Sequence, residues 1–240
     1  MALPKLNVPV YEAILPSTEK VIKYRPFLVK EEKILLTALE DDSGDSLPGA
    51  VKQIIGNCVQ GELDVERLPT FDIEFLFLRL RAKSVGESVS IGLRPWGCPN
   101  NEGKLCEKST EVEINLEEVK VVKNSEHTNK IMIDDNIGVI MDYPNTSSIQ
   151  KEEGDAFTVG LNYVKNGIKM VFTKEETFER DSFSDEELGE FIDSLSSDQF
   201  QKIKTFFDTM PMLKHTVKDK CNTCGEKKET TLQGLNSFFG

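Results

Sequence analysis

The sequence lacks the features that mark membrane and secreted proteins. No run of apolar residues approaches the length of about 18 that a membrane-spanning helix requires. The opening residues, MALPKLNVPVYEAILP, do not have the charged-then-apolar layout of a signal peptide. These absences predict a protein of a reducing compartment, in which paired cysteines favour metal binding over disulfides.

The sequence also has little of what catalysis usually needs. It contains only two histidines, His127 and His215, and neither belongs to a recognisable motif. There is no G-x-S-x-G elbow, no glycine-rich phosphate loop and no H-E-x-x-H pair. We therefore predict that the protein is not an enzyme and has no catalytic residues.

A concentrated basic stripe is missing as well. The formal net charge is −12, and residues 175–198 hold ten acids against the single base Arg180. Such a segment repels a phosphate backbone, and no basic stripe with interleaved aromatic residues balances it, so the sequence predicts no nucleic-acid binding. The acidic segment is interpreted either as a solvated helical face or as a docking surface for a basic partner.

What the sequence does contain is four cysteines in two pairs. Cys98 and Cys106 flank one loop, and Cys221 and Cys224 form a C-x-x-C motif followed by Gly225. The tight turn of a C-x-x-C motif directs both thiolates at one ion, which is half of a tetrahedral metal site. We predict a structural zinc ion held by all four.

Several alternatives to four-cysteine zinc remain open. The spacing of the first pair is wider than in a standard zinc knuckle, and an iron–sulfur cluster, unliganded thiols or disulfides would use the same residues. His215 lies six residues before Cys221 and is a possible ligand in place of one cysteine. A thiol–disulfide enzyme would need the motif beside a βαβ unit, whereas the surrounding sequence predicts a β-knuckle.

The fifth cysteine differs from the other four. Cys58 lies on the apolar face formed by Val51, Ile54 and Ile55. A small buried thiol in a hydrophobic core is the expected role.

The first half of the chain alternates between strand and helix patterns. Strands are predicted within residues 8–27, 88–94 and 109–122, and helices over residues 28–39, 48–59 and 70–84. The run Phe75-Leu76-Phe77-Leu78-Arg79-Leu80 is apolar on nearly all sides, which predicts a helix buried among several neighbours.

The second half predicts strands at 131–134 and 137–142 and then two helices. Ser184 with Glu187, and Ser196 with Gln199, each form a capping box ahead of apolar residues at helical spacing. The two helices predict an acidic helical hairpin that ends at Pro211, and the tail predicts short strands around the C-x-x-C motif.

The predicted fold class is therefore α+β, with small antiparallel sheets, packed helices, a four-cysteine zinc-ribbon-like knuckle and the acidic C-terminal hairpin. The expected organisation has an N-terminal α+β domain with the first cysteine pair over residues 1–125. Linker strands and the acidic hairpin occupy residues 126–212. A knuckle over residues 213–240 returns to the first domain.

Three segments in the first ninety or so residues carry a family resemblance. They are PVYEAILPSTEKVIKYRPFLVKEEKILL, then AVKQIIGNC, then LPTFDIEFLFLRLRAKSVGE, and the pieces R-P-F-x-V-K-E-E and R-A-K-S-V-G-E are the most specific. In this order and spacing they resemble the T4-type bacteriophage baseplate hub subunit family. The resemblance covers residues 8–93 well and extends more loosely to the end of the chain.

The resemblance implies a virus-encoded protein that works in the assembly of the hub of a contractile tail baseplate, without enzymatic activity. It implies other hub proteins as partners. The implied location is the host cytoplasm during assembly, with the virion tail baseplate as a second location. The competing hypothesis is a zinc-ribbon viral accessory protein that acts on nucleic acid or the transcription machinery, which would need a basic face.

Overall fold

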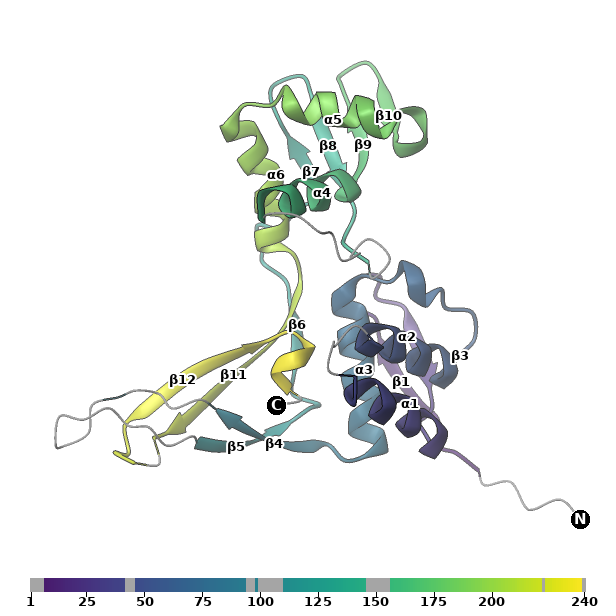
Figure 1. Ribbon diagram of the computed structural model, residues 1–240, viewed down its shortest axis with the longest axis vertical. Helices are drawn as coiled ribbons and strands as arrows, with labels where there is room; N and C mark the ends of the chain where they lie inside the picture. Colours follow the sequence, from purple (N-terminus) through teal and green to yellow (C-terminus); the bar gives the residue numbers. More distant parts are fainter. Residues whose placement is uncertain are drawn as a thin grey trace, which may run out of the picture. The chain divides into compact units, whose positions relative to one another are not determined.

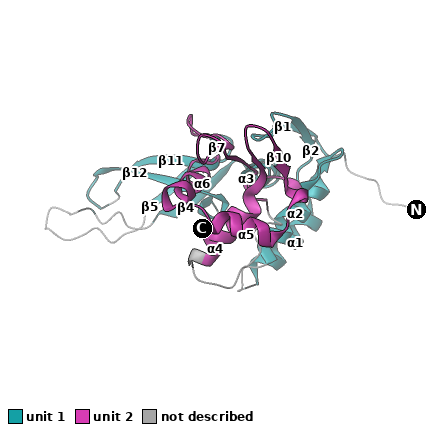
Figure 2. Cartoon of the chain, turned by 90° about the horizontal axis from the view of Figure 1, so that it is seen from above, with its two compact units in different colours: residues 1–65, 71–122, 212–240 teal, residues 66–70, 123–211 magenta. Residues whose placement is uncertain are grey.

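The structure is a computed structural model that describes residues 7–41, 46–93, 98, 110–145, 156–221 and 223–238. The chain divides into two compact units, coloured separately in Figure 2. Unit 1 comprises residues 1–65, 71–122 and 212–240, and unit 2 comprises residues 66–70 and 123–211. Both combine small antiparallel sheets with helices, which confirms the α+β class (Figure 1).

The described residues form six α-helices and three short 3-10 helices. The α-helices are α1 (Val29–Leu39), α2 (Ser46–Cys58), α3 (Thr70–Ser84), α4 (Ala156–Gly167), α5 (Asp185–Asp193) and α6 (Ser197–Thr209). The 3-10 helices are η1 (Val65–Arg67), η2 (Arg180–Ser182) and η3 (Leu235–Phe238). Within the described ranges, no helix is both long and apolar enough to span a bilayer.

The strands pair in four antiparallel sheets. Unit 1 contains the sheets β1-β2-β3, β4-β5 and β12-β11-β6, and unit 2 contains β10-β9-β8-β7. The strand bounds are β1 (Tyr11–Ile14), β2 (Val21–Tyr24), β3 (Val59–Gln60), β4 (Ser88–Leu93), β5 (Thr110–Asn115), β6 (Lys120–Val122), β7 (Lys130–Met132), β8 (Gly138–Met141), β9 (Ile168–Phe172), β10 (Thr177–Glu179), β11 (Met212–Lys220) and β12 (Lys227–Gln233).

Helix α3 is a central helix of unit 1, as its apolar sequence predicted. Eight of its residues are buried, and even Asp72 is fully buried, where it accepts hydrogen bonds from the backbone N–H and the hydroxyl of Ser17. Burial raises the pKa of Asp72, although these hydrogen bonds oppose the shift. The Asp72 carboxyl therefore ties the turn between β1 and β2 to the helix.

A buried ion pair fixes the start of α1. Glu31 is fully buried and accepts from Arg25 at 3.0 Å and from the backbone N–H of Leu28 at 2.9 Å. The Arg25 guanidinium also donates to the carbonyl of Asn57 at 2.9 Å, so it links β2, α1 and the end of α2. Both partners lie in the R-P-F-x-V-K-E-E segment, which therefore has a structural role in this fold.

The predicted strand over residues 109–122 is two strands in different sheets, and that prediction was wrong in its extent. The Asn115 side chain accepts from the backbone N–H of Glu117 at 2.9 Å, a local hydrogen bond that turns the chain out of β5. The carbonyls of Leu116 and Val119 in this turn accept from the Arg79 guanidinium at 3.0 and 2.9 Å. The turn thus docks on α3 before β6 begins.

Unit 2 has its own hydrophobic core between its sheet and its helices. Ten buried side chains from β7, β8, α4, β9, α5 and α6 and the adjoining loop form it, with aromatic residues such as Phe200 and Phe207 packed at its edge. Gly138 is required in β8, because a Cβ there would clash with the ring of Phe172 and lie 2.9 Å from the carbonyl oxygen of Ile131.

Both capping boxes in unit 2 are confirmed. The Ser184 hydroxyl accepts from the Glu187 backbone N–H, and the Ser196 hydroxyl accepts from that of Gln199. In contrast, α4, β9 and β10 were not predicted. Helix α4 contains Gly160 and ends at Gly167, and glycine weakens the helical signal.

Candidate metal centre

The C-x-x-C motif forms the connection between β11 and β12. The Cys221 backbone N–H donates to the carbonyl of Glu226 at 2.8 Å, and the Gly225 N–H donates to the carbonyl of Cys221 at 2.8 Å. Gly225 has a φ of +74°, in the left-handed region that favours glycine. These bonds make the tight turn that the sequence predicted, and they bring Cys221 and Cys224 to one side of it.

Cys98 joins the two knuckle cysteines from a distant part of the sequence. It follows β4, and its Sγ lies 3.2 Å from the Sγ of Cys224. The Sγ atoms of Cys98, Cys221 and Cys224 all lie within 4.8 Å of one another. Cys98, which lies between β4 and β5 in the sequence, therefore meets the turn between β11 and β12 at a group of three thiols.

The three sulfur atoms fit a metal ion in both spacing and environment. Thiolates around a tetrahedral zinc are about 3.8 Å apart, since each Zn–S bond is about 2.3 Å. Cys98 and Cys221 are buried, with exposed fractions of 2% and 3%, and the group packs chiefly on itself rather than into one of the larger apolar cores. Burying polarisable thiols together without an apolar core suits a metal ligand set better than ordinary packing.

The knuckle also stabilises negative charge on sulfur. The backbone N–H groups of Cys224 and Thr223 donate to the Cys221 sulfur and lower the pKa of that thiol to about 6. The pKa of Lys228 is raised, first by its contact with Glu226 at 3.2 Å and further by the charges of Cys98 and Cys224. Thiolate is the form that binds a metal, so the site is prepared for a cation.

The other predicted or alternative ligands are distributed as follows. Cys106 lies outside the described residues. His215 pairs with Leu232 in the middle of β11, and six residues of strand, about 20 Å, separate it from Cys221. It does not join the thiol group. Cys58 is buried at the end of α2 beside buried Val51, Ile54 and Ile55, as predicted, and burial raises its pKa to about 11.

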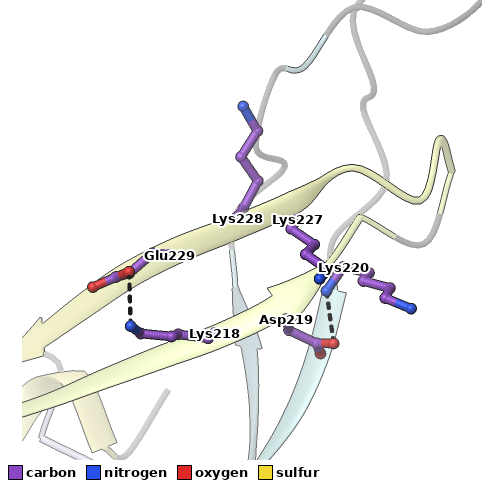
Figure 3. A pocket seen from close by; sticks show the side chains of 6 residues that line it. All are labelled: Lys218, Asp219, Lys220, Lys227, Lys228 and Glu229. Carbon is purple, nitrogen blue, oxygen red and sulfur yellow. Dashed lines mark hydrogen bonds and ion pairs between the residues drawn. The ribbon is translucent and has the colours of Figure 1, made fainter.

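A basic sheet face next to this knuckle was missed by sequence reasoning. Lysines recur on alternate positions of β11 at Lys214, Lys218 and Lys220, with Lys227 opposite on β12. Six residues, Lys218, Asp219, Lys220, Lys227, Lys228 and Glu229, line a surface hollow of about 640 Å³ (Figure 3). The alternation of lysines along residues 214–220 could be read from the sequence. It was overlooked because the net charge of the whole chain is −12.

Comparison with known families gives one finding for nearly the whole chain. A family model described as "T4 bacteriophage base plate protein" matches residues 8–240. Comparisons with curated proteins and with solved structures gave no match. The family match extends through both units and includes the three thiols of the candidate metal centre.

Proposed function

The chain belongs to the T4 bacteriophage base plate protein family, and from this premise we propose that it is a non-enzymatic structural and assembly protein of the baseplate hub. Its partners in this proposal are other hub proteins. It acts in the host cytoplasm during assembly and is carried in the tail baseplate of the virion. The observation that supports this most directly is a family match that spans residues 8–240 rather than one motif.

The hub assignment is tested by removing the gene from the phage. We expect heads and free tail components but no complete baseplates under the electron microscope, and complementation with the wild-type gene should restore them. Normal baseplates in the deletion phage would contradict the proposal.

We further propose that one zinc ion binds Cys98, Cys106, Cys221 and Cys224 in a zinc-ribbon-like knuckle. The convergence of three thiols, the burial of Cys98 and Cys221, and the N–H groups directed at Cys221 support it. The ion would supply no chemistry beyond cross-linking the two hairpins. In the chain-entropy account, closing a loop of about 100 residues contributes about 4–5 kcal/mol.

Metal analysis of gently purified protein tests the zinc proposal. We expect about one zinc per chain and a colourless protein. Brown protein with iron and sulfide would indicate a cluster instead. Cys106→Ser should weaken zinc binding as Cys221→Ser does, and unchanged affinity in the Cys106 variant would remove it from the ligand set.

The acidic segment 175–198, with α5 and α6 as a helical hairpin, is proposed to dock a basic partner. Its exposed carboxylates would accelerate encounter more than they would tighten binding. Glu186→Lys with Glu190→Lys should reduce capture of a hub protein in a salt-sensitive way, whereas Glu62→Lys with Glu126→Lys, which adds the same charge elsewhere, should not. Equal capture by both double variants would leave the segment as a solvated face.

Finally, we propose that residues 1–125 and 213–240 fold as one domain and that residues 126–212 form a second. The closeness of Cys98 to Cys224 and the pairing of β6 with β11 support the first grouping. Limited proteolysis should cut near residues 125 and 212 and leave the two N- and C-terminal pieces associated.

A further inference from the structure

The outward face of the sheet β12-β11-β6 carries an excess of lysine. Side chains at alternate positions of a strand share a face, and register partners on neighbouring strands share it too. On this face lie five lysines and one glutamate: Lys120, Lys214, Lys218, Lys220, Lys227 and Glu229. In a chain of net charge −12, this basic face is a local reversal of sign.

The lysines of the basic face are placed against one another. Lys214 is the register partner of Lys120, and Lys220 is the register partner of Lys227. Like charges directly opposite on neighbouring strands destabilise a sheet. Among the described residues, Lys218 is the only lysine of this face with an ion-pair partner, because its Nζ lies 3.3 Å from a carboxylate oxygen of Glu229.

Figure 3 shows the end of this face at the last register pair of β11 and β12. Lys218 and Glu229 reach each other across the two strands, while Lys220 and Lys227 extend from the last paired position. These residues line the hollow of about 640 Å³. Asp219 and Lys228 line it as well, so an anionic group that enters the hollow would meet four ammonium groups and two carboxylates.

Nucleic acid is not the ligand that this face favours. Single strands are bound by aromatic side chains on which bases stack. The outward positions of β11 and β12 carry Met212 and otherwise lysine, threonine, glutamine and glutamate. An acidic protein surface is the better match.

The chain itself presents such a surface on α5. Glu186 and Glu190 are exposed and lie four residues apart, as neighbours on one helical face, and Asp193 is exposed one turn further on. Like charges at this spacing destabilise a helix. The lysine face and the α5 face are therefore both internally repulsive, and they have opposite signs.

We propose that the basic face of one copy docks the acidic α5 face of a second copy, in a head-to-tail contact. This rests on the proposed function and identifies the basic partner of segment 175–198. The strand from Lys214 to Lys220 extends about 20 Å, and the nine residues of α5 extend about 13 Å. The helix thus fits along the face. A heterologous contact of this kind builds rings or chains rather than isolated dimers.

The test uses the purified full-length chain with its metal, in sedimentation velocity over a range of concentrations. We expect association that grows with concentration and weakens at high salt, because exposed charges are screened. A monomer at every concentration in low salt would overturn the proposal. It would leave the hub assignment intact, since that depends on the deletion phage.

The decisive variant is Lys120→Glu with Lys227→Glu. It turns both Lys–Lys register pairs into Lys–Glu pairs, so the sheet should melt at the same temperature or higher. The face then has three charges of each sign, and self-association should weaken about tenfold or more. Lys20→Glu with Lys33→Glu changes two exposed lysines outside the face and should associate like wild type. Equal weakening by both variants would show that self-association depends only on the net charge of the chain, and it would overturn the proposal.

Mixing two variants gives a second, independent readout. The Lys120→Glu, Lys227→Glu chain keeps its acidic helix, and the Glu186→Lys, Glu190→Lys chain keeps its basic face. Each alone should be monomeric, and the mixture should form a one-to-one dimer and nothing larger. Failure of the mixture to dimerise would contradict the head-to-tail contact. Salt-sensitive binding of the wild type, but not of the lysine variant, to duplex or single-stranded DNA would assign the face to nucleic acid instead.

Discussion

Two buried cysteines in unit 1 have opposite surroundings. Cys58, at the end of α2, is surrounded by apolar side chains, and burial raises its pKa to about 11. Cys221, in the knuckle, is equally buried, but backbone N–H groups lower its pKa to about 6. Burial alone therefore does not decide the state of a thiol. The polar groups that face it do.

The knuckle and unit 2 differ in how much apolar surface they bury. The core of unit 2 contains ten buried side chains and a fringe of aromatic rings, whereas the knuckle packs three cysteines chiefly on one another. Apolar burial can hold the first region together. The second has little apolar area of its own. Its turn is held by backbone hydrogen bonds, and a metal bound as proposed would add a cross-link to them.

The largest expected difference is between Cys221→Ser and Cys58→Ser. The first removes a ligand from a site of the kind that contributes about 10–16 kcal/mol in zinc-finger peptides, although the loss should be smaller here because a core survives without the metal. The second places a hydroxyl among apolar side chains and should cost about 1–3 kcal/mol. Thermal melts of both variants, with and without chelator, measure this. Equal shifts would mean that the metal is absent or incidental.

A cavity created by mutation in the core of unit 2 should cost stability by an amount that does not depend on chelator. Phe206 is 2% exposed and contacts the rings of His127, Tyr143 and Phe207. Phe206→Ala should cost about 3–5 kcal/mol, and adding chelator should not change that cost. A free energy of unfolding close to that of the wild type in Phe206→Ala would show that this core is loosely packed.

Alkylation should distinguish the two thiols without altering stability. After removal of metal at pH 8, Cys221 is mostly thiolate and should react with iodoacetamide, whereas Cys58 is protonated and buried and should react only after unfolding. Mass spectrometry of the labelled peptides gives the rates. Comparable labelling of Cys58 in the folded chain would remove the contrast. With zinc bound, Cys221 should be protected.

The smallest effect concerns His127 in unit 2. Its ring nitrogens lie 2.9 Å from the Thr209 hydroxyl and 3.0 Å from the Tyr143 hydroxyl, and burial lowers its pKa. A histidine with a lowered folded pKa takes up its proton more readily when unfolded. Unit 2 should therefore lose stability as the pH falls below about 6.5, the unfolded value. His127→Phe keeps the ring stacking and should flatten this dependence in denaturant titrations. An unchanged slope would assign the pH dependence to other groups.

What the sequence determined by itself is local. The capping boxes at Ser184 and Ser196, the continuous burial of α3, the apolar setting of Cys58 and the turn at Gly225 depend on contacts within a few residues or on the face of one helix. Such contacts follow from residue type and spacing, because residues a few positions apart in a helix or a turn lie close together in space. The family resemblance was likewise present in the order of its segments.

Only the tertiary structure decided the rest. Cys98 and Cys224 meet across 126 residues, and Lys120 faces Lys214 because β6 pairs with β11. The break between β5 and β6 depends on Arg79 from α3, and α4 is helical despite its glycines because Leu161 and Val164 pack into the core of unit 2. Each of these depends on which strand or helix is the neighbour. Which elements become neighbours depends on the burial of apolar surface over the whole unit, so it cannot be read from the spacing of nearby residues.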